Sequence, residues 1–380
     1  YIGTTDIAAK LTDDGVLTIY PTYSATRDTV VPSIGGWHKD NTAYPWFNAV
    51  YGKDFSDPAI SGSNWNGTTT QLANLKKVVW DKGITDTGAY LFNEAKQWPS
   101  TAVEFQIPDS VTIIGAALNG GLRSAGEVCV VPENVTSLGW GFGGNSAKDV
   151  YILNPDLTNI PYDDNAASGK YNRNIVYATT DKFTVHVKAE SDAYAALNRD
   201  GKTYQNVTTH TDMGACGVAP YSSEVFWLYD ESTKTLTIKG SGAMRDYAST
   251  YAAPWAYYDV ETVTVDAGIT QIGAYAFASL KKITKDNVTL DSNVKVADTA
   301  FAKPDAQGRL PLPQSDDLYF NEYIGDTTIA AKMSKADGVL TIYPTDKNTV
   351  VPSIKGYRGD NTAYPWFEMY KKTYPTKDPK

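Results

Sequence analysis

A short pattern returns four times between residues 84 and 161 of this 380-residue chain. The four copies, Ile84–Gly88, Val111–Gly115, Val135–Gly139 and Leu157–Pro161, are spaced by 27, 24 and 22 residues. A β-rich run and a turn precede each copy, so each repeat is predicted to form one coil of a solenoid. One coil of about 23 residues leaves apolar positions uncovered at both ends and is stable only beside a neighbour. We therefore expect stacked coils whose strands form a parallel sheet, about 4.8 Å apart.

The glycine that ends the pattern has a predicted structural role. Gly88, Gly115 and Gly139, with Gly273 in a related later segment, stand where the chain must turn tightly. Because glycine has no Cβ, it adopts positive φ angles at little cost. We expect positive φ angles at these four positions.

A longer repeat surrounds the coils. Gly15–Thr22 returns unchanged as Gly338–Thr345, and Asp40–Phe47 returns as Asp360–Phe367. A weaker copy lies between them, in which Lys234–Ile238 replaces the first strand. We call this unit the head module, a hairpin-like entry followed by a loop and a Pro-Trp corner. The first and third heads are the outer heads, and the second is the middle head.

The residues carry a resemblance to a known family. Ile107–Gly115 and Gly268–Phe277 resemble the BspA-like leucine-rich repeats of bacterial cell-surface proteins. Gly214–Trp255 is similar to the module that often precedes such repeats, and Val185–Tyr194 to the strand and short helix that close them. The resemblance covers most of the chain. It implies a curved, α/β-type leucine-rich-repeat solenoid that is β-rich with short helices, a secreted or cell-surface location, and adhesion or binding.

Some positions depart from that repeat. The phenylalanine expected after the glycine is present at Phe92, Phe277 and Phe301. Residue 119 is Asn, Phe142 comes one place early, and Pro161 replaces the glycine. The coil boundaries between residues 140 and 180 therefore stay open.

The two periods predict a division into domains. In chain order these are head module 1 (1–74), solenoid 1 with a C-terminal cap (75–203), head module 2 (204–259), a short repeat segment (260–306), a linker (307–317) and head module 3 without coils (318–380).

Charge and hydropathy restrict the partners. The formal net charge is -9 at pH 7, and negative charge repels the phosphates that dominate binding to nucleic acid. No run approaches the roughly 18 apolar residues of a membrane span. We therefore expect no nucleic-acid partner and no membrane span in this segment, which also shows no signal peptide.

The residues that usually carry catalysis are scarce. The chain has three histidines, His38, His186 and His210, and two cysteines, Cys129 and Cys216. Motifs of hydrolases, zinc proteases and P-loops are absent from the sequence. Adjacent aspartates such as Asp13-Asp14 are predicted to be solvated turn residues. We predict a protein that is not an enzyme and has no cofactor and no metal. The two cysteines are either buried thiols or a disulfide.

Aromatic residues are the candidate ligand contacts. Trp37, His38 and Tyr357 lie in polar, glycine-containing loops of the outer heads, where an exposed side chain could meet a ligand. The recurring Trp46, Trp255 and Trp366 are either platforms for sugar rings or large side chains that seal their heads. We expect the sealing role for these three tryptophans.

Three functions follow from these observations. The first is a non-enzymatic, secreted or surface-exposed binding or adhesion protein whose solenoid presents a ligand site to a host or bacterial surface protein or a glycan. The second is a structural protein that assembles head to tail through Tyr323–Lys380. The third is a glycan-binding module of a larger complex.

Overall fold

The structure is a computed structural model with two compact units, residues 1–228 and 229–380. It describes residues 1–2, 5–22, 29–33, 74–92, 102–118, 127–144, 146–163, 173–178, 180–199, 201, 203–247, 252–312, 314–345, 350–351 and 364–367. Strands dominate, as expected for a β-rich chain. The helices in the described ranges are short and include α3 (Asp192–Ala196) and the 3₁₀-helices η4 (Ser222–Glu224), η5 (Pro254–Tyr257) and η6 (Lys285–Asn287).

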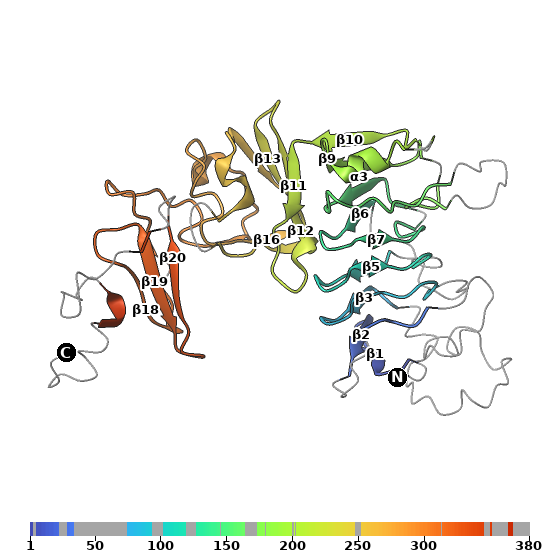
Figure 1. The fold of residues 1–380 in the computed structure, drawn as a ribbon, viewed down its shortest axis with the longest axis horizontal. Coiled ribbons are helices and arrows are strands. Elements are labelled where there is room, and N and C mark those ends of the chain that lie inside the picture. The colour runs from blue at the N-terminus through green and yellow to red at the C-terminus, as the bar shows by residue number, and fades with distance from the viewer. Residues whose placement is uncertain are drawn as a thin grey trace. The chain divides into compact units, whose positions relative to one another are not determined.

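The strands of the first unit pair mainly in parallel (Figure 1). They are β1 (Ile7–Leu11), β2 (Val16–Pro21), β3 (Lys77–Trp80), β4 (Glu104–Gln106), β5 (Ile113–Ile114), β6 (Val128–Val131), β7 (Ser137–Leu138), β8 (Asp149–Ile152), β9 (Thr184–Lys188), β10 (Val207–His210), β11 (Asp212–Ala215) and β12 (Val225–Asp230), the last of which crosses the unit boundary. β1 and β2 form an antiparallel hairpin. Parallel pairing then joins β2, β3 and β4, and separately β6, β8, β9 and β10.

The repeating pattern forms a second ladder along the same unit. Backbone N–H groups of Thr85, Thr112 and Thr136 donate to the carbonyls of Thr29, Thr85 and Thr112, at 2.8, 2.9 and 2.8 Å. β5 and β7 pair in parallel at the same level of the pattern. The second and third copies of the pattern thus each lie on the copy before them, as the spacing predicted.

The repeating glycines have two different roles. Gly88 has a φ of +76°, as predicted. The prediction is wrong for Gly115, Gly139 and Gly273, which do not have positive φ angles. A Cβ on Gly115 would lie 2.0 Å from the carbonyl oxygen of Gly88, so glycine is required there by the close approach of two coils.

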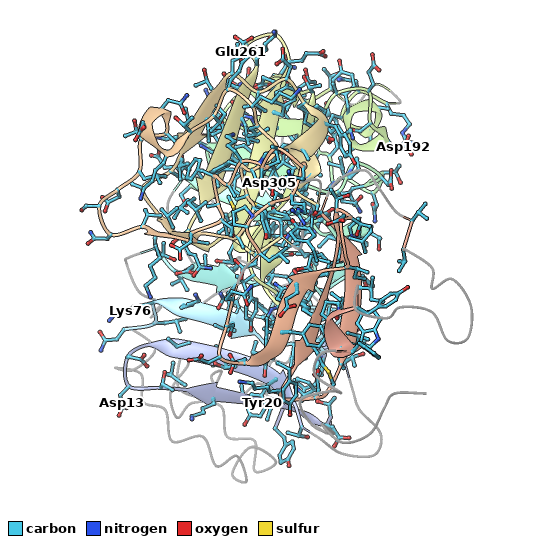
Figure 2. The ribbon with its side chains drawn as sticks, turned by 90° about the vertical axis from the view of Figure 1, so that its left-hand side faces the viewer. Asp13, Tyr20, Lys76, Asp192, Glu261 and Asp305 are labelled. Carbon is cyan, nitrogen blue, oxygen red and sulfur yellow. The ribbon has the colours of Figure 1, made fainter. Side chains whose placement is uncertain are left out.

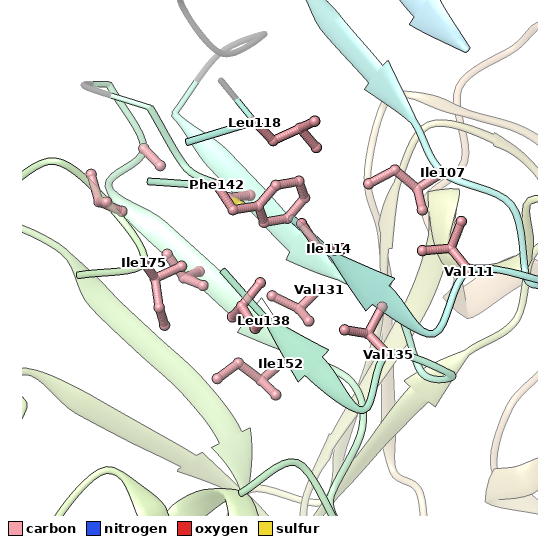
Figure 3. Packing of buried hydrophobic residues seen from close by; sticks show 14 of the residues in the cluster. Ile107, Val111, Ile114, Leu118, Val131, Val135, Leu138, Phe142, Ile152 and Ile175 are labelled. Atoms are coloured by element: carbon pink, nitrogen blue, oxygen red, sulfur yellow. The ribbon is translucent and has the colours of Figure 1, made fainter. Parts of the chain in front are cut away.

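Apolar side chains from successive rungs form one core in the first unit. Leu17 and Ile19 of β2 are fully buried beside Val78 and Trp80 of β3, and the cluster continues through the later coils (Figure 3). Fully burying one such side chain contributes about 1.5–3 kcal/mol. The departures from the repeat are accommodated in this core, because Leu118 is fully buried just before Asn119 and Phe142 is 5% exposed.

The end of the first stack differs in one respect from the implied cap. β9 and the short helix α3 are present where the resemblance placed them, and the Ser191 hydroxyl caps α3 by accepting from the Tyr194 N–H at 3.1 Å. β9 is not terminal, however, because β10 adds to it in parallel. The sheet therefore extends one strand past the expected end.

Both cysteines are buried. Burial raises the pKa of the Cys129 thiol to about 12. The protonated thiol of Cys129 packs in the core as a small apolar group.

The second unit contains the remaining strands. They are β13 (Thr235–Gly240), β14 (Gly242–Ala243), β15 (Thr262–Val265), β16 (Ile269–Ile272), β17 (Lys295–Val296), β18 (Leu318–Tyr323), β19 (Ile329–Ser334) and β20 (Leu340–Pro344). β13 pairs with β15 in parallel, and β16 pairs in parallel with β14 and β17. β18, β19 and β20 form an antiparallel sheet. Just before β13 and β15 in the chain, exposed charged groups form ion pairs: Lys234 and Lys282 each bridge Asp259 and Glu261, of which Figure 2 labels Glu261.

The tryptophan of the middle head has the sealing role expected for it. Trp255 is fully buried, and its Nε1–H donates to the Ala276 carbonyl at 2.7 Å. Trp366 packs partly buried against the apolar core of the third head. Trp46 lies outside the described residues.

Candidate binding face

The three candidate ligand contacts, Trp37, His38 and Tyr357, lie outside the described residues. Their role stays a prediction. The described part of the first unit offers a different candidate, the side of its parallel strands that points away from the core.

We call this side the outward face. Strand register places alternate residues on it: Val16, Thr18 and Tyr20 of β2; Lys77 and Val79 of β3; Glu104 and Gln106 of β4; Val128 and Val130 of β6; Asp149 and Tyr151 of β8; Thr184, His186 and Lys188 of β9; and Thr208 and His210 of β10. The residues between them, such as Leu17 and Val150, are in the core. Because every position is fixed by a backbone ladder, the face presents its side chains in defined rows.

Neighbouring positions of β8, β9 and β10 on this face carry a polar cluster that the sequence analysis missed. His186 contacts the Asp149 Oδ1 through Nε2 at 2.9 Å and the His210 Nε2 through Nδ1 at 3.1 Å. Tyr151 stacks on the His186 ring, with centroids 4.2 Å apart. Both ring nitrogens of His186 are thus engaged by protein groups. The signal was available, since the separation of His186 and His210, 24 residues, is a coil spacing.

The polar cluster does not amount to a metal centre. Across the part of the chain that the structure describes, no group of three or more His, Cys, Asp or Glu side chains is placed to hold a metal ion. The cluster instead orders the side chains of β8, β9 and β10 relative to one another.

Residues 212–228, which we call the cover segment, lie over part of the outward face. Phe226 packs on Tyr151 with ring centroids 4.8 Å apart, within a cluster that also contains Met213 and Leu228. Asp109 anchors the segment: its Oδ1 accepts from the Ser222 N–H at 2.9 Å and from the Ser222 hydroxyl at 2.6 Å. The cover segment therefore already occupies part of the outward face at β8 and β9.

Charged groups lie where the cover segment approaches β3 and β4. Lys77 Nζ and Glu104 Oε1 form an ion pair at 2.7 Å. Burial and, to a smaller extent, the Glu104 carboxylate raise the pKa of Glu224 to about 7, while the Lys77 ammonium opposes the shift. Glu224 therefore changes charge near neutral pH at the border of the covered region.

The remaining rows are the candidate ligand surface. Thr18 and Tyr20 of β2, Val79 of β3 and Gln106 of β4 are half-buried, so each has solvent-accessible atoms. Figure 2 labels Tyr20 at the end of β2. A surface that mixes an aromatic ring, an aliphatic group, a hydroxyl and an amide suits contact with a polar protein surface or a sugar.

Comparisons with known proteins identify two solved structures of low similarity. No protein-family model and no curated protein matches the chain. A crystal structure of a leucine-rich repeat protein from Eubacterium ventriosum is 15% identical, with 79% of this chain and 81% of that chain covered and a TM-score of 0.22. A leucine rich cell surface protein from Faecalibacterium prausnitzii is 12% identical, with coverages of 80% and 89% and a TM-score of 0.16. Similarity at this level does not assign a function.

In the described ranges, no helix has both the length and the hydropathy needed to cross a bilayer.

Proposed function

We propose that the chain is a non-enzymatic binding or adhesion protein of the BspA-like leucine-rich-repeat type, exposed at the cell surface. The observation that carries the proposal is the outward face, in which a stack of parallel strands holds rows of half-buried side chains. Rigid strands position such side chains at little entropic cost on binding. The ligand class is a surface protein or a glycan of the host or of a bacterium.

The rows of β2, β3 and β4 supply the contacts in this proposal. The cover segment occupies part of the rows farther along the stack, as the contact between Phe226 and Tyr151 shows. Thr18, Tyr20, Val79 and Gln106 remain accessible in part. The loops that contain Trp37, His38 and Tyr357 stay candidates for additional contacts.

The test is a binding screen of the full chain against arrays of extracellular proteins and glycans. For any ligand found, the double variant Tyr20→Ala/Gln106→Ala is expected to weaken binding at least tenfold. The control is Tyr194→Ala, because Tyr194 is 38% exposed on α3, away from the outward face.

Two outcomes would contradict this proposal. Loss of binding on Trp37→Ala, with no effect of the double variant, would place the ligand in the head loops. A hydrolytic activity abolished by changing one Asp or Glu would contradict the non-enzymatic role. Head-to-tail assembly through residues 323–380 is tested separately, by comparing the sedimentation of the intact chain with that of a chain ending near residue 310.

A further inference from the structure

An identical stretch of eight residues occurs in two surroundings. Gly15–Thr22 contains β2, and Gly338–Thr345 contains β20. Each strand pairs antiparallel with the strand before it in the same register, so Ile19 lies opposite Ala9 and Ile342 lies opposite Ala331. The local structure of the two hairpins is therefore the same.

The apolar side chains of the two strands differ in burial. Leu17 and Ile19 are fully buried, beside Val78 and Trp80 of the neighbouring strand β3. Leu340 and Ile342, at the matching positions, are each 41% exposed. Among the residues that the structure describes, β19 is the only strand that pairs with β20, so the second edge of β20 has no neighbouring strand.

The middle head shows that the covered arrangement is the general one. Its matching strand, β13, pairs in parallel with β15, and Leu236 and Ile238 are fully buried. Leu236 lies opposite Val263, just as Leu17 lies opposite Val78. In two of the three heads, the first strand of the coils that follow the head lies beside the two apolar residues, Leu17 and Ile19 or Leu236 and Ile238, and both residues are buried.

The same backbone atoms receive the coil strand in both of those heads. The Gly15 carbonyl accepts from the Lys76 and Lys77 N–H groups at 2.8 and 3.2 Å. The Lys234 carbonyl accepts from the Glu261 and Thr262 N–H groups at 2.9 and 3.2 Å. The matching acceptor in the third head is the carbonyl of Gly338.

The receiving backbone of the third head already has the required conformation. Gly338 has a φ of +68°, beside +88° for Gly15 and +50° for Lys234. A Cβ on Gly15 would lie 2.3 Å from the Asn74 carbonyl oxygen of the incoming coil, whereas a Cβ on Gly338 would meet no atom within 4 Å. The site is thus preformed and open.

We propose that β20 is a docking edge for a β-strand of the coil type, which adds in parallel with one apolar residue opposite Leu340 and a second opposite Ile342. The required chemistry is that of Lys77–Trp80, in which the half-buried Lys77 and Val79 alternate with the fully buried Val78 and Trp80. Main-chain hydrogen bonds supply the affinity, and the two apolar positions supply the selectivity. This inference concerns a surface of the second unit and does not depend on the proposed binding face.

The test uses the full chain and a peptide with the sequence of residues 74–92. Hydrogen exchange at the backbone amides of Leu340 and Ile342 is expected to slow at least tenfold when the peptide is added. A peptide carrying Val78→Asp and Trp80→Asp is expected to have no effect, since the two buried side chains are then charged. This arm needs no change to the protein.

A matched pair of protein variants completes the experiment. Ile342→Asp is expected to abolish the peptide effect, whereas Thr341→Asp, on the opposite side of the same strand, is expected to preserve it. No slowing at about 1 mM peptide, a concentration at which a Kd of about 1 mM or tighter would be detected, would overturn the proposal. Equal slowing by the charged peptide would also overturn it. Self-association of the chain without peptide, if lost on Ile342→Asp, would show that a second copy of the chain occupies the edge. That result would overturn the proposal that a coil-type strand binds there.

Discussion

At the scale of single residues, the turn of each coil depends on the backbone conformation of the residue two places after the repeating glycine. The residue two places after that glycine has a left-handed backbone, with φ angles of 63° at Tyr90, 52° at Ala117, 76° at Gly141 and 55° at Tyr275. A left-handed conformation costs a residue with a side chain about 1–2 kcal/mol. The N–H of Ala117 donates to the Trp140 carbonyl of the next coil at 2.7 Å, which helps to offset that cost. Stacking, and not local preference, therefore fixes the backbone here.

The two matching glycines of the outer heads allow a prediction at this scale. Gly15→Ala and Gly338→Ala both place a side chain in a left-handed conformation, at a cost of about 1 kcal/mol. Gly15→Ala must in addition displace the Asn74 backbone, 2.3 Å from the new Cβ. We expect it to destabilise β1 and β2 by roughly 3 kcal/mol or more. Native-state hydrogen exchange in each hairpin measures both values, and equal losses would contradict the prediction.

At the scale of elements, the cover segment combines apolar and charged contacts with the first stack. Phe226 and Met213 pack near Tyr151, and Asp109 holds Ser222. Between these anchors, Glu224 faces the ion pair of Lys77 and Glu104. The pKa of Glu224 is raised in the folded state, so the folded protein binds a proton that the unfolded chain releases at lower pH.

This shift predicts a pH dependence of stability. As the pH rises from about 4.5 to about 7, the folded state loses the advantage of its neutral Glu224, and the free energy of unfolding falls. Glu224→Gln removes this loss. Relative to the parent, its stability is expected to increase over that window by roughly 3 kcal/mol and to stay constant above it. Urea unfolding between pH 4 and 8 measures the difference, and parallel pH profiles would refute the role of Glu224.

At the scale of the whole molecule, the first compact unit runs to residue 228 and includes the cover segment. The domain boundary that the sequence predicts after residue 203 stays a prediction, because compactness alone does not define an independently folding domain. In a stack of coils, each rung is stabilised mainly by its neighbours. The cover segment crosses several rungs, so it adds long-range contacts to the contacts between neighbouring rungs.

Removal of one anchor of the cover segment tests this long-range contribution. Phe226 is 1% exposed, so Phe226→Ala is expected to destabilise the unit by about 3–5 kcal/mol. Hydrogen exchange at the amides of β8 and β9 should then accelerate by a factor of about 100 or more. Tyr194→Ala serves as the exposed control. Unchanged protection of β8 and β9 in the Phe226 variant would show that the cover segment does not stabilise the stack.

The sequence alone determined the features that repeat from one coil to the next. The spacing of Val111 and Val135 predicted the parallel pairing, and the recurrence of the Pro-Trp corner predicted that Trp255 is buried. These features are readable because equivalent residues of stacked coils face the same surroundings. Tertiary structure alone decided which surfaces are covered, since Ser222 meets Asp109 across 113 residues and the same Leu-Thr-Ile strand is buried at Leu17 but exposed at Leu340. A repeat specifies its own strand, whereas burial depends on whatever chain segment arrives beside it.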